Sequence, residues 1–170
     1  CAVAPVPVPR SGTVRGRQNT KYKILNTEIR DSKQLSRQQR EFFYKIITKD
    51  PNVGWGIGKV SEKMIDKINI LEATKLAMKR AVENLEKKLF VPLLDGRQKV
   101  GIDFLILDGN FKINLNIPQK SIIKADEKVF SCAAASILAK VWRDRIMEKY
   151  HRKYPRYGFA KHKGYPTKLH

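Results

Sequence analysis

Two short apolar runs, each followed by an aspartate, constrain what this chain can fold into. Residues 104–107 (FLIL) precede Asp108, and residues 121–125 (SIIKA) precede Asp126. Apolar runs of roughly four to eight residues are consistent with buried strands. A carboxylate at the end of such a strand costs free energy unless a partner, commonly a metal ion, stabilises its charge. We therefore expect two strands that bring their acids to one shared site.

Helical and strand-like patterns alternate around these runs. Ser36 is a suitable N-cap for a first helix, residues 66–89 form the longest predicted helix, and a helix after Asp126 extends to about residue 153. Residues 53–60 have strand composition, and their three glycines predict the close approach of another element. The alternation predicts an α/β architecture with a mixed central sheet flanked by helices. The side chains expected to be buried by the first two helices are Phe42, Phe43, Ile46 and Ile47, and then Ile68, Leu71, Leu76, Met78, Val82, Leu85 and Leu89.

The charge of the chain indicates a polyanionic partner. It has 35 Lys and Arg against 16 Asp and Glu, a net charge of +19, and residues 111–170 carry +10 of it. Nucleic acid is the commonest such partner and an acidic membrane surface the second, while a merely solvated lysine-rich surface is the alternative. The tail interleaves aromatic rings with cations, as nucleic-acid-binding surfaces do. These residues are Tyr154, Tyr157, Phe159 and Tyr165 with Arg156, Lys161, His162, Lys163 and Lys168.

Cysteine content and hydropathy limit the classes of protein to which this chain can belong. Cys1 and Cys132 form neither a disulfide framework nor a zinc-binding spacing. No apolar run approaches the roughly 20 residues that a bilayer-spanning helix needs, and no secretory leader is visible. We therefore expect a cytoplasmic protein without a membrane partner.

The two aspartates have the chemistry of a magnesium or manganese site. Hard divalent cations prefer carboxylate, water and phosphate oxygens, and two ions bridged by aspartates can hydrolyse a phosphodiester. Gly109 would let the backbone turn sharply beside such an ion. In the alternative interpretation, LDG simply ends a strand in a turn and Asp126 caps the next helix. Spacing alone leaves both interpretations open.

Five motifs in order resemble the bacterial ribonuclease HII family, over a region from about residue 29 to residue 170. They are DSKQLS (31–36), INILEATKLAMKRAV (68–82), LDGN (107–110), KADEKVFSCAAASILAKVWRD (124–144) and YGFAKHKGYPTKLH (157–170). The resemblance implies a ribonuclease H-like fold and a monomeric two-metal endonuclease that uses Mg²⁺ or Mn²⁺. It also implies a substrate, the RNA strand of RNA–DNA hybrids or single ribonucleotides in duplex DNA, and hence a role in DNA replication and repair.

The same resemblance assigns roles to individual residues. Asp108 and Asp126 would be metal-binding catalytic carboxylates. Tyr165 would pack on the sugar at the RNA–DNA junction, and Lys33 would contact a backbone phosphate. His162 and Lys163 would either line the same groove or be structural.

The chain also departs from the family pattern. No Asp-Glu pair with a Gly-Arg-Gly loop precedes the strand-like start, so two of four expected carboxylates are not found. We expect a fragment truncated at both ends, with little activity alone. Its parts would be a strand remnant with a basic loop (1–30), a catalytic core (31–153) and the start of a C-terminal substrate-binding region (154–170). The alternatives are a non-catalytic nucleic-acid-binding module that kept the fold and, last, a basic ribosomal or structural RNA-binding protein.

Overall fold

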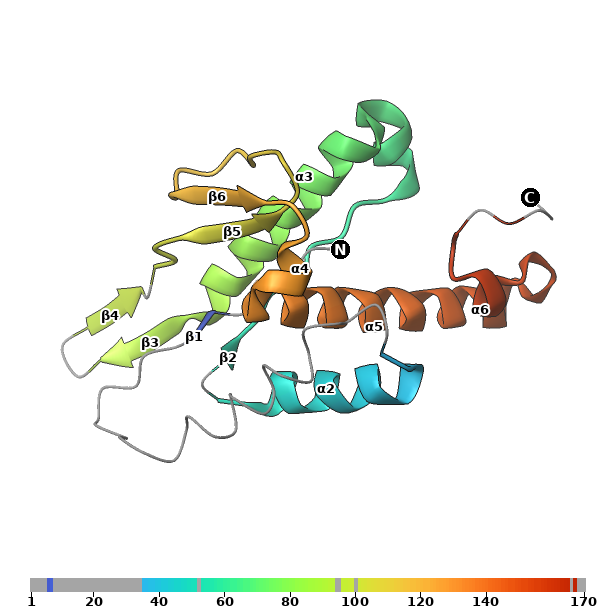
Figure 1. Cartoon of the computed structure of the whole chain (residues 1–170), viewed down its shortest axis with the longest axis horizontal. Helices are drawn as coiled ribbons and strands as arrows, with labels where there is room; N and C mark the ends of the chain where they lie inside the picture. Colours follow the sequence, from blue (N-terminus) through green and yellow to red (C-terminus); the bar gives the residue numbers. More distant parts are fainter. Residues whose placement is uncertain are drawn as a thin grey trace.

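The computed structural model describes residues 6–7, 35–51, 53–93, 96–99, 101–165 and 167. Its elements, in chain order, are β1 (Val6–Pro7), α2 (Arg37–Lys49), β2 (Val53–Gly54), α3 (Glu62–Lys88), β3 (Phe90–Leu93), β4 (Gly96–Lys99), β5 (Leu105–Asp108), β6 (Gln119–Ile122), α4 (Ala125–Lys128), α5 (Phe130–Lys153), the 3-10 helix η1 (Pro155–Tyr157) and α6 (Phe159–His162). Figure 1 shows α2 running alongside α5, with β5 and β6 beside α3. Helices and strands alternate, which confirms the predicted α/β class.

The described strands form three separate two-stranded pairs. β1 with β2 and β3 with β4 are antiparallel, whereas β5 and β6 are parallel, with Leu105 opposite Gln119 and Asp108 opposite Ile122. Both strand orientations of the expected mixed sheet are therefore present within the described ranges. The strand expected over residues 53–60 is shorter than predicted, since only β2 and an isolated bridge at Gly58 are strand-like.

Two glycines after β2 lie directly against the backbone of α3. A Cβ atom on Gly56 would lie 2.1 Å from the Ala81 carbonyl oxygen, and one on Gly58 would lie 1.8 Å from that of Ala77. No side chain fits at such distances, so the close approach predicted from the glycines is confirmed at these two positions. The buried face of α3 is correspondingly lined by small residues, with alanines at 73, 77 and 81.

A kink at Asn69 divides α3. Asn69 has φ 67°, and its Oδ1 accepts hydrogen bonds from the amides of Leu71 (2.9 Å) and Glu72 (3.1 Å), as a helix N-cap does. The segment before Asn69 therefore does not continue the apolar stripe of the segment after it. Leu71, expected to be buried, is exposed, because it lies in the first turn after this break.

The first hydrophobic core lies between α2 and α5. It comprises Phe43, Tyr44, Ile47, Ala133, Ala134, Ile137, Leu138 and Val141. The predicted N-cap is confirmed, because Ser36 and Gln39 form a reciprocal capping box. The prediction that Phe42 is buried is wrong: its side chain is 58% exposed. Successive helical residues are rotated by about 100°, and α5 packs on the stripe that contains Phe43 and Ile47.

The second core lies between α3 and the β5–β6 pair. It comprises Val82, Leu85, Leu89, Ile102, Leu105, Leu107 and Ile113. Alternate residues of β5 enter it, which leaves Ile106 and Asp108 on the other face of the strand. In the described part of the chain, no helix is both long and apolar enough to cross a membrane.

Candidate active site

Asp108 ends strand β5 and is solvent-exposed. Gly109 follows with φ 138°, and a Cβ atom there would lie 2.7 Å from the Phe111 ring. This is a conformation that side chains other than glycine rarely adopt, so glycine permits the sharp turn after the aspartate, as the sequence predicted. The Gly109 amide still donates to the Ile122 carbonyl (3.1 Å), which keeps the turn joined to β6.

Asp126 does not end a strand, contrary to the sequence prediction. β6 stops at Ile122, Lys124 adopts a left-handed conformation (φ 57°), and Asp126 lies in the first turn of α4. Its side chain is only 5% exposed, whereas the neighbouring Glu127 is exposed and ion-paired with Lys124 (3.5 Å). The burial supports the choice of Asp126 over Glu127 as the site residue.

A hydrogen bond joins Asp108 to the start of the helix that carries Asp126. Asp108 Oδ1 accepts from the backbone amide of Ala125 at 3.0 Å, at the start of the helix that carries Asp126. The partly positive N-terminus of a helix stabilises a carboxylate in this position. Asp108 therefore helps to fix α4, and with it the location of Asp126, although the two residues arrive from different elements.

Both aspartates line a cavity of about 240 Å³ between α3, β5 and α5. The other walls are mainly apolar or small side chains, namely Met78, Ala81, Val82, residues 105–107, Ile113, Cys132, Ala135, Ser136 and Ala139. Because Asp108 is exposed, the acidic end of this cavity is open to solvent. Apolar walls strengthen electrostatic interactions deeper in the cavity, since they lower the local dielectric constant there.

The pKa of the Cys132 thiol is affected by the charges of the two aspartates. Burial, and then the negative charge of Asp108 and more weakly that of Asp126, raises the pKa of Cys132 to about 11, although a hydrogen bond with Ser131 opposes the shift. The thiol is therefore protonated near neutral pH, which makes it a poor nucleophile and a poor metal ligand. Cys132 is thus a partly buried residue of the cavity wall.

The donor set fits one hard divalent cation. Two carboxylates supply oxygen ligands, and Mg²⁺ or Mn²⁺ completes its coordination with water and phosphate oxygens. Among the residues that the structure describes, no group of three or more His, Cys, Asp or Glu residues converges on a common point. Asp108 and Asp126 therefore suit one such ion, whereas two ions would require further ligands.

Tyr165 lies on the same side of α5, about one turn beyond the cavity. Ala139 lines the cavity, the Nζ of Lys140 lies 5.1 Å from the centre of the Tyr165 ring, and the Arg143 guanidinium lies 4.3 Å from it. The ring is 48% exposed. One turn of helix is about 5.4 Å, so the two residues that contact the ring follow Ala139 of the cavity wall within about one turn of α5.

Arg143 fixes the turn that carries Tyr165. Its Nε donates to the Lys163 carbonyl (3.2 Å) and its Nη2 to the Gly164 carbonyl (3.2 Å). Lys163 (φ 50°) and Gly164 (φ 77°) are both left-handed, so the chain reverses tightly here. No site role was predicted for Arg143 or Lys140. Their spacing of three residues, which places them on one helix face, was the available signal.

Two of the other predicted site residues have structural contacts. His162 donates from Nε2 to the Tyr157 carbonyl (2.7 Å) and accepts at Nδ1 from the Gly164 amide (3.0 Å). Lys163 Nζ lies 2.8 Å from Glu148 Oε1. Lys163 therefore holds the turn to α5, and His162 joins the turn to η1. A direct substrate role for either stays a prediction. Lys33 lies outside the described residues.

Comparison with known proteins decides the family. The family model described as Ribonuclease HII matches residues 13–170. The chain belongs to the ribonuclease HII family. Curated ribonuclease HII proteins are similar to it: that of Chlamydia trachomatis serovar A is 46% identical over 142 residues, that of Syntrophus aciditrophicus 47% over 143, and that of Treponema denticola 48% over 144.

The chain spans only part of these ribonuclease HII proteins. The alignments cover 84% of this chain, but 59%, 61% and 73% of the three relatives. The crystal structure of ribonuclease H2 from Pyrococcus horikoshii OT3 matches 98% of this chain and 81% of its own, with a TM-score of 0.60 and 24% identity. The predicted ribonuclease H-like fold is therefore confirmed.

Proposed function

We propose that this chain carries a catalytic core for an endoribonuclease that cleaves the RNA strand of RNA–DNA hybrids and single ribonucleotides embedded in duplex DNA. The observation that carries the proposal is a pair of aspartates at the open end of an apolar cavity, with Asp108 hydrogen-bonded to the amide that precedes Asp126, in a chain of the ribonuclease HII family. The net charge of +19 supports a polyanionic substrate, because it attracts phosphodiester backbones.

Asp108 and Asp126 would hold Mg²⁺ or Mn²⁺, which when bound would activate a water molecule and stabilise the leaving alkoxide. A carboxylate has two oxygen atoms, and the Ala125 amide orients Asp108 through one of them. Asp126 is positioned by α4 and shielded from solvent, so its charge favours a cation beside it. A two-ion reaction is part of the proposal, and it requires carboxylates in addition to these two.

Tyr165 would select the position of cleavage. Its exposed ring offers a flat face to a sugar, while Arg143 beneath it and the turn at residues 163–164 limit its movement. The Lys140 ammonium lies next to the ring and is also ion-paired with Asp144 (2.9 Å). The ring and the two acids would thus bind neighbouring groups of one nucleotide strand.

The test is cleavage of a duplex that contains one ribonucleotide, in Mg²⁺ or Mn²⁺, by this chain and in parallel by the protein that its full reading frame encodes. We expect the full-length protein to cut at the ribonucleotide and the 170-residue chain to cut far less. Asp108→Asn and Asp126→Asn should each lower the rate by about 100-fold or more, since each removes a charged ligand. The exposed Asp103 provides a control, and Asp103→Asn should cut normally. Equal cleavage by Asp108→Asn, or equal cleavage of an all-DNA duplex, would overturn the proposal.

A second candidate is a non-catalytic nucleic-acid-binding module. It is favoured by the finding that, within the described residues, no group of three or more His, Cys, Asp or Glu side chains could hold a metal ion. This hypothesis predicts duplex binding that does not depend on divalent ions and no cleavage by either form of the protein.

A further inference from the structure

A second surface rich in aromatic and basic side chains lies at the C-terminal end of α5. We call it the distal surface, and it consists of Lys149, Tyr150, Arg152, Lys153, Tyr154, Arg156, Tyr157, Phe159 and Lys161. Residues 149–165 contain six Lys and Arg and no Asp or Glu. No step of the proposed reaction uses the distal surface.

The aromatic rings of the distal surface pack against one another and remain open to solvent. The rings of Tyr157 and Phe159 are stacked, with centroids 5.7 Å apart and planes 7° apart, and Tyr154 meets Tyr157 edge-on at 6.2 Å. Tyr157 is nevertheless 68% exposed, and Tyr150 and Tyr154 are exposed as well. Clustered exposed rings are unusual on a surface that binds nothing.

The backbone of this surface is held in place before any partner arrives. The Tyr157 carbonyl accepts from His162 Nε2 at 2.7 Å, and the Gly158 amide donates to the Pro155 carbonyl at 3.2 Å. Gly158 adopts φ 67°, which lets α6 fold back beside the end of α5. A preformed surface loses little conformational entropy on binding.

The chemistry of the distal surface fits nucleic acid best. Its cations match phosphates, and tyrosine rings pack on sugars and bases regardless of sequence. An interfacial membrane segment would instead expose Leu, Phe or Trp, whereas the exposed large apolar side chains of residues 149–165 are all tyrosines. The nearest acid, Glu148, is already ion-paired with Arg37 (2.7 Å) and Lys163 (2.8 Å), so it does not oppose a polyanion.

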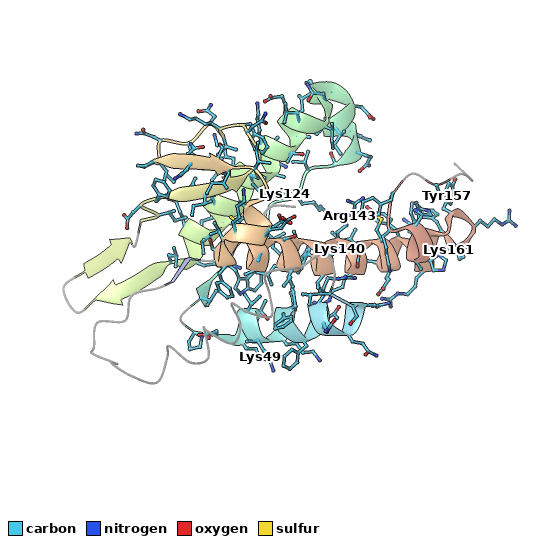
Figure 2. The ribbon with its side chains drawn as sticks, in the orientation of Figure 1. Lys49, Lys124, Lys140, Arg143, Tyr157 and Lys161 are labelled. Atoms are coloured by element: carbon cyan, nitrogen blue, oxygen red, sulfur yellow. The ribbon has the colours of Figure 1, made fainter. Side chains whose placement is uncertain are left out.

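The distal surface lies in line with the candidate active site. Figure 2 shows Lys140 and Arg143, and then Tyr157 and Lys161, following one another toward the C-terminal end of α5. The cavity reaches α5 at Ala139, about 15 residues before Tyr154, which corresponds to roughly 22 Å of helix. Duplex rises by about 3.4 Å per base pair, so this spacing equals six or seven base pairs.

We propose that the distal surface binds the backbone of the same nucleic-acid duplex about six or seven base pairs to one side of the site of cleavage. This inference rests on the proposed function for the location of that site, but its binding step does not require cleavage. The contact would lengthen the footprint on the substrate and orient the duplex along α5.

The test is binding, measured by fluorescence anisotropy without divalent ions, of duplexes with one central ribonucleotide. One flank is kept at four base pairs while the other is extended from four to twelve, and then the flanks are exchanged. We expect affinity to rise at about six or seven base pairs on one side only. The expected gain in affinity is about fivefold or more, and Tyr157→Ala should remove it while leaving the affinity for the shortest duplex unchanged.

Matched variants keep the experiment decisive. Tyr157→Phe retains the ring and should retain the gain in affinity from the longer flank. Lys49 lies at the exposed end of α2, away from this surface, so any change in affinity in Lys49→Ala should be the same for all flank lengths. Thermal melts check that the variants are folded. The proposal is overturned if Tyr157→Ala and Lys49→Ala change the affinity for the duplex equally at every flank length. It is also overturned if Tyr157→Ala weakens binding to phosphatidylserine vesicles as much as it weakens binding to the long duplex. Failure of the proposed function would appear separately, as the absence of cleavage.

Discussion

Arg143→Ala is expected to loosen the turn that carries Tyr165 without unfolding the protein. The substitution removes two hydrogen bonds, to the carbonyls of Lys163 and Gly164, and the guanidinium contact with the Tyr165 ring. At 3.2 Å and partial exposure, each hydrogen bond contributes about 0.5–1 kcal/mol, and the cation–π contact contributes about 0.5–1 kcal/mol. The sum of about 2 kcal/mol corresponds to a roughly 30-fold shift toward the open turn.

The assay is amide hydrogen exchange at the two turn residues whose amides are bonded within the turn. The Gly164 amide donates to His162 Nδ1 (3.0 Å) and the Tyr165 amide to the His162 carbonyl (2.9 Å). Both should exchange about 30-fold faster in Arg143→Ala, while amides in the middle of α5 keep their protection, because local opening does not require global unfolding. In the full-length protein, the same variant should spread cleavage over neighbouring positions, as a mobile Tyr165 selects the junction less strictly.

Two control variants define the refuting result. Arg143→Lys keeps the charge but cannot donate to both carbonyls in the same fork, so an intermediate effect is expected. Lys149→Ala, an exposed change on the same helix, should leave the turn unchanged. If Arg143→Ala leaves the exchange of Gly164 and Tyr165 as in the parent, then Arg143 does not hold the turn, and its assignment as a positioning residue is refuted.

Three further predictions concern packing and titration. Gly58→Ala should destabilise the fold by about 3 kcal/mol or more, because its Cβ would lie 1.8 Å from a backbone oxygen of α3, whereas Gly101→Ala, which meets nothing within 4 Å, should change it by less than about 0.5 kcal/mol in a urea titration. Burial and then the Asp108 charge raise the pKa of the Cys132 thiol to about 11, so its alkylation in EDTA at pH 9 should be about 50-fold slower in the folded than in the urea-unfolded chain, and faster in folded Asp108→Asn than in the folded parent; equal rates in the folded and unfolded chain would contradict this. The raised pKa also stabilises the folded state fully below pH 9, and this contribution to the free energy of unfolding should be lost as the pH rises toward 11. The hydrogen bond from Lys163 lowers the pKa of Glu148, so its stabilising effect should be present above the usual carboxyl pKa and disappear as acid titrates the group, and a Glu148→Gln variant should show a flatter stability profile in that acid range.

Residue chemistry predicted those features that local sequence determines. The capping box at Ser36, the sharp turn at Gly109 and the close packing of Gly56 and Gly58 all follow from what one or two side chains permit. The end of α5 at Lys153 follows in the same way from Pro155, which a helix interior does not accept. Asp144 is ion-paired with Lys140, one turn earlier on the same helix (2.9 Å), as the i,i+4 spacing of an acid and a base permits.

The wrong predictions concern residues whose placement depends on backbone geometry or on contacts far apart in the sequence. Asp126 was predicted to end a strand because SIIK resembles a strand. Lys124 instead adopts a left-handed conformation, which a lysine in the sequence does not predict, and helix α4 begins at the next residue, before Asp126. Leu71 looked buried because the periodicity does not reveal the kink at Asn69. The ion pair of Lys163 with Glu148 joins residues 15 positions apart, so local sequence did not indicate it, and a substrate role for Lys163 stays a prediction.

The hydrogen bond from the Ala125 amide to Asp108 couples the position of one acid to that of the other. A change at position 108 alters the start of α4 and so displaces Asp126, which means that the effects of mutations at 108 and 126 will not be additive. Asparagine at 108 keeps the acceptor oxygen, whereas alanine removes it together with the charge. A lineage that abandoned catalysis would therefore still be selected to keep an oxygen acceptor at 108 for folding. Drift at 126 would be the earlier sign of a lost activity.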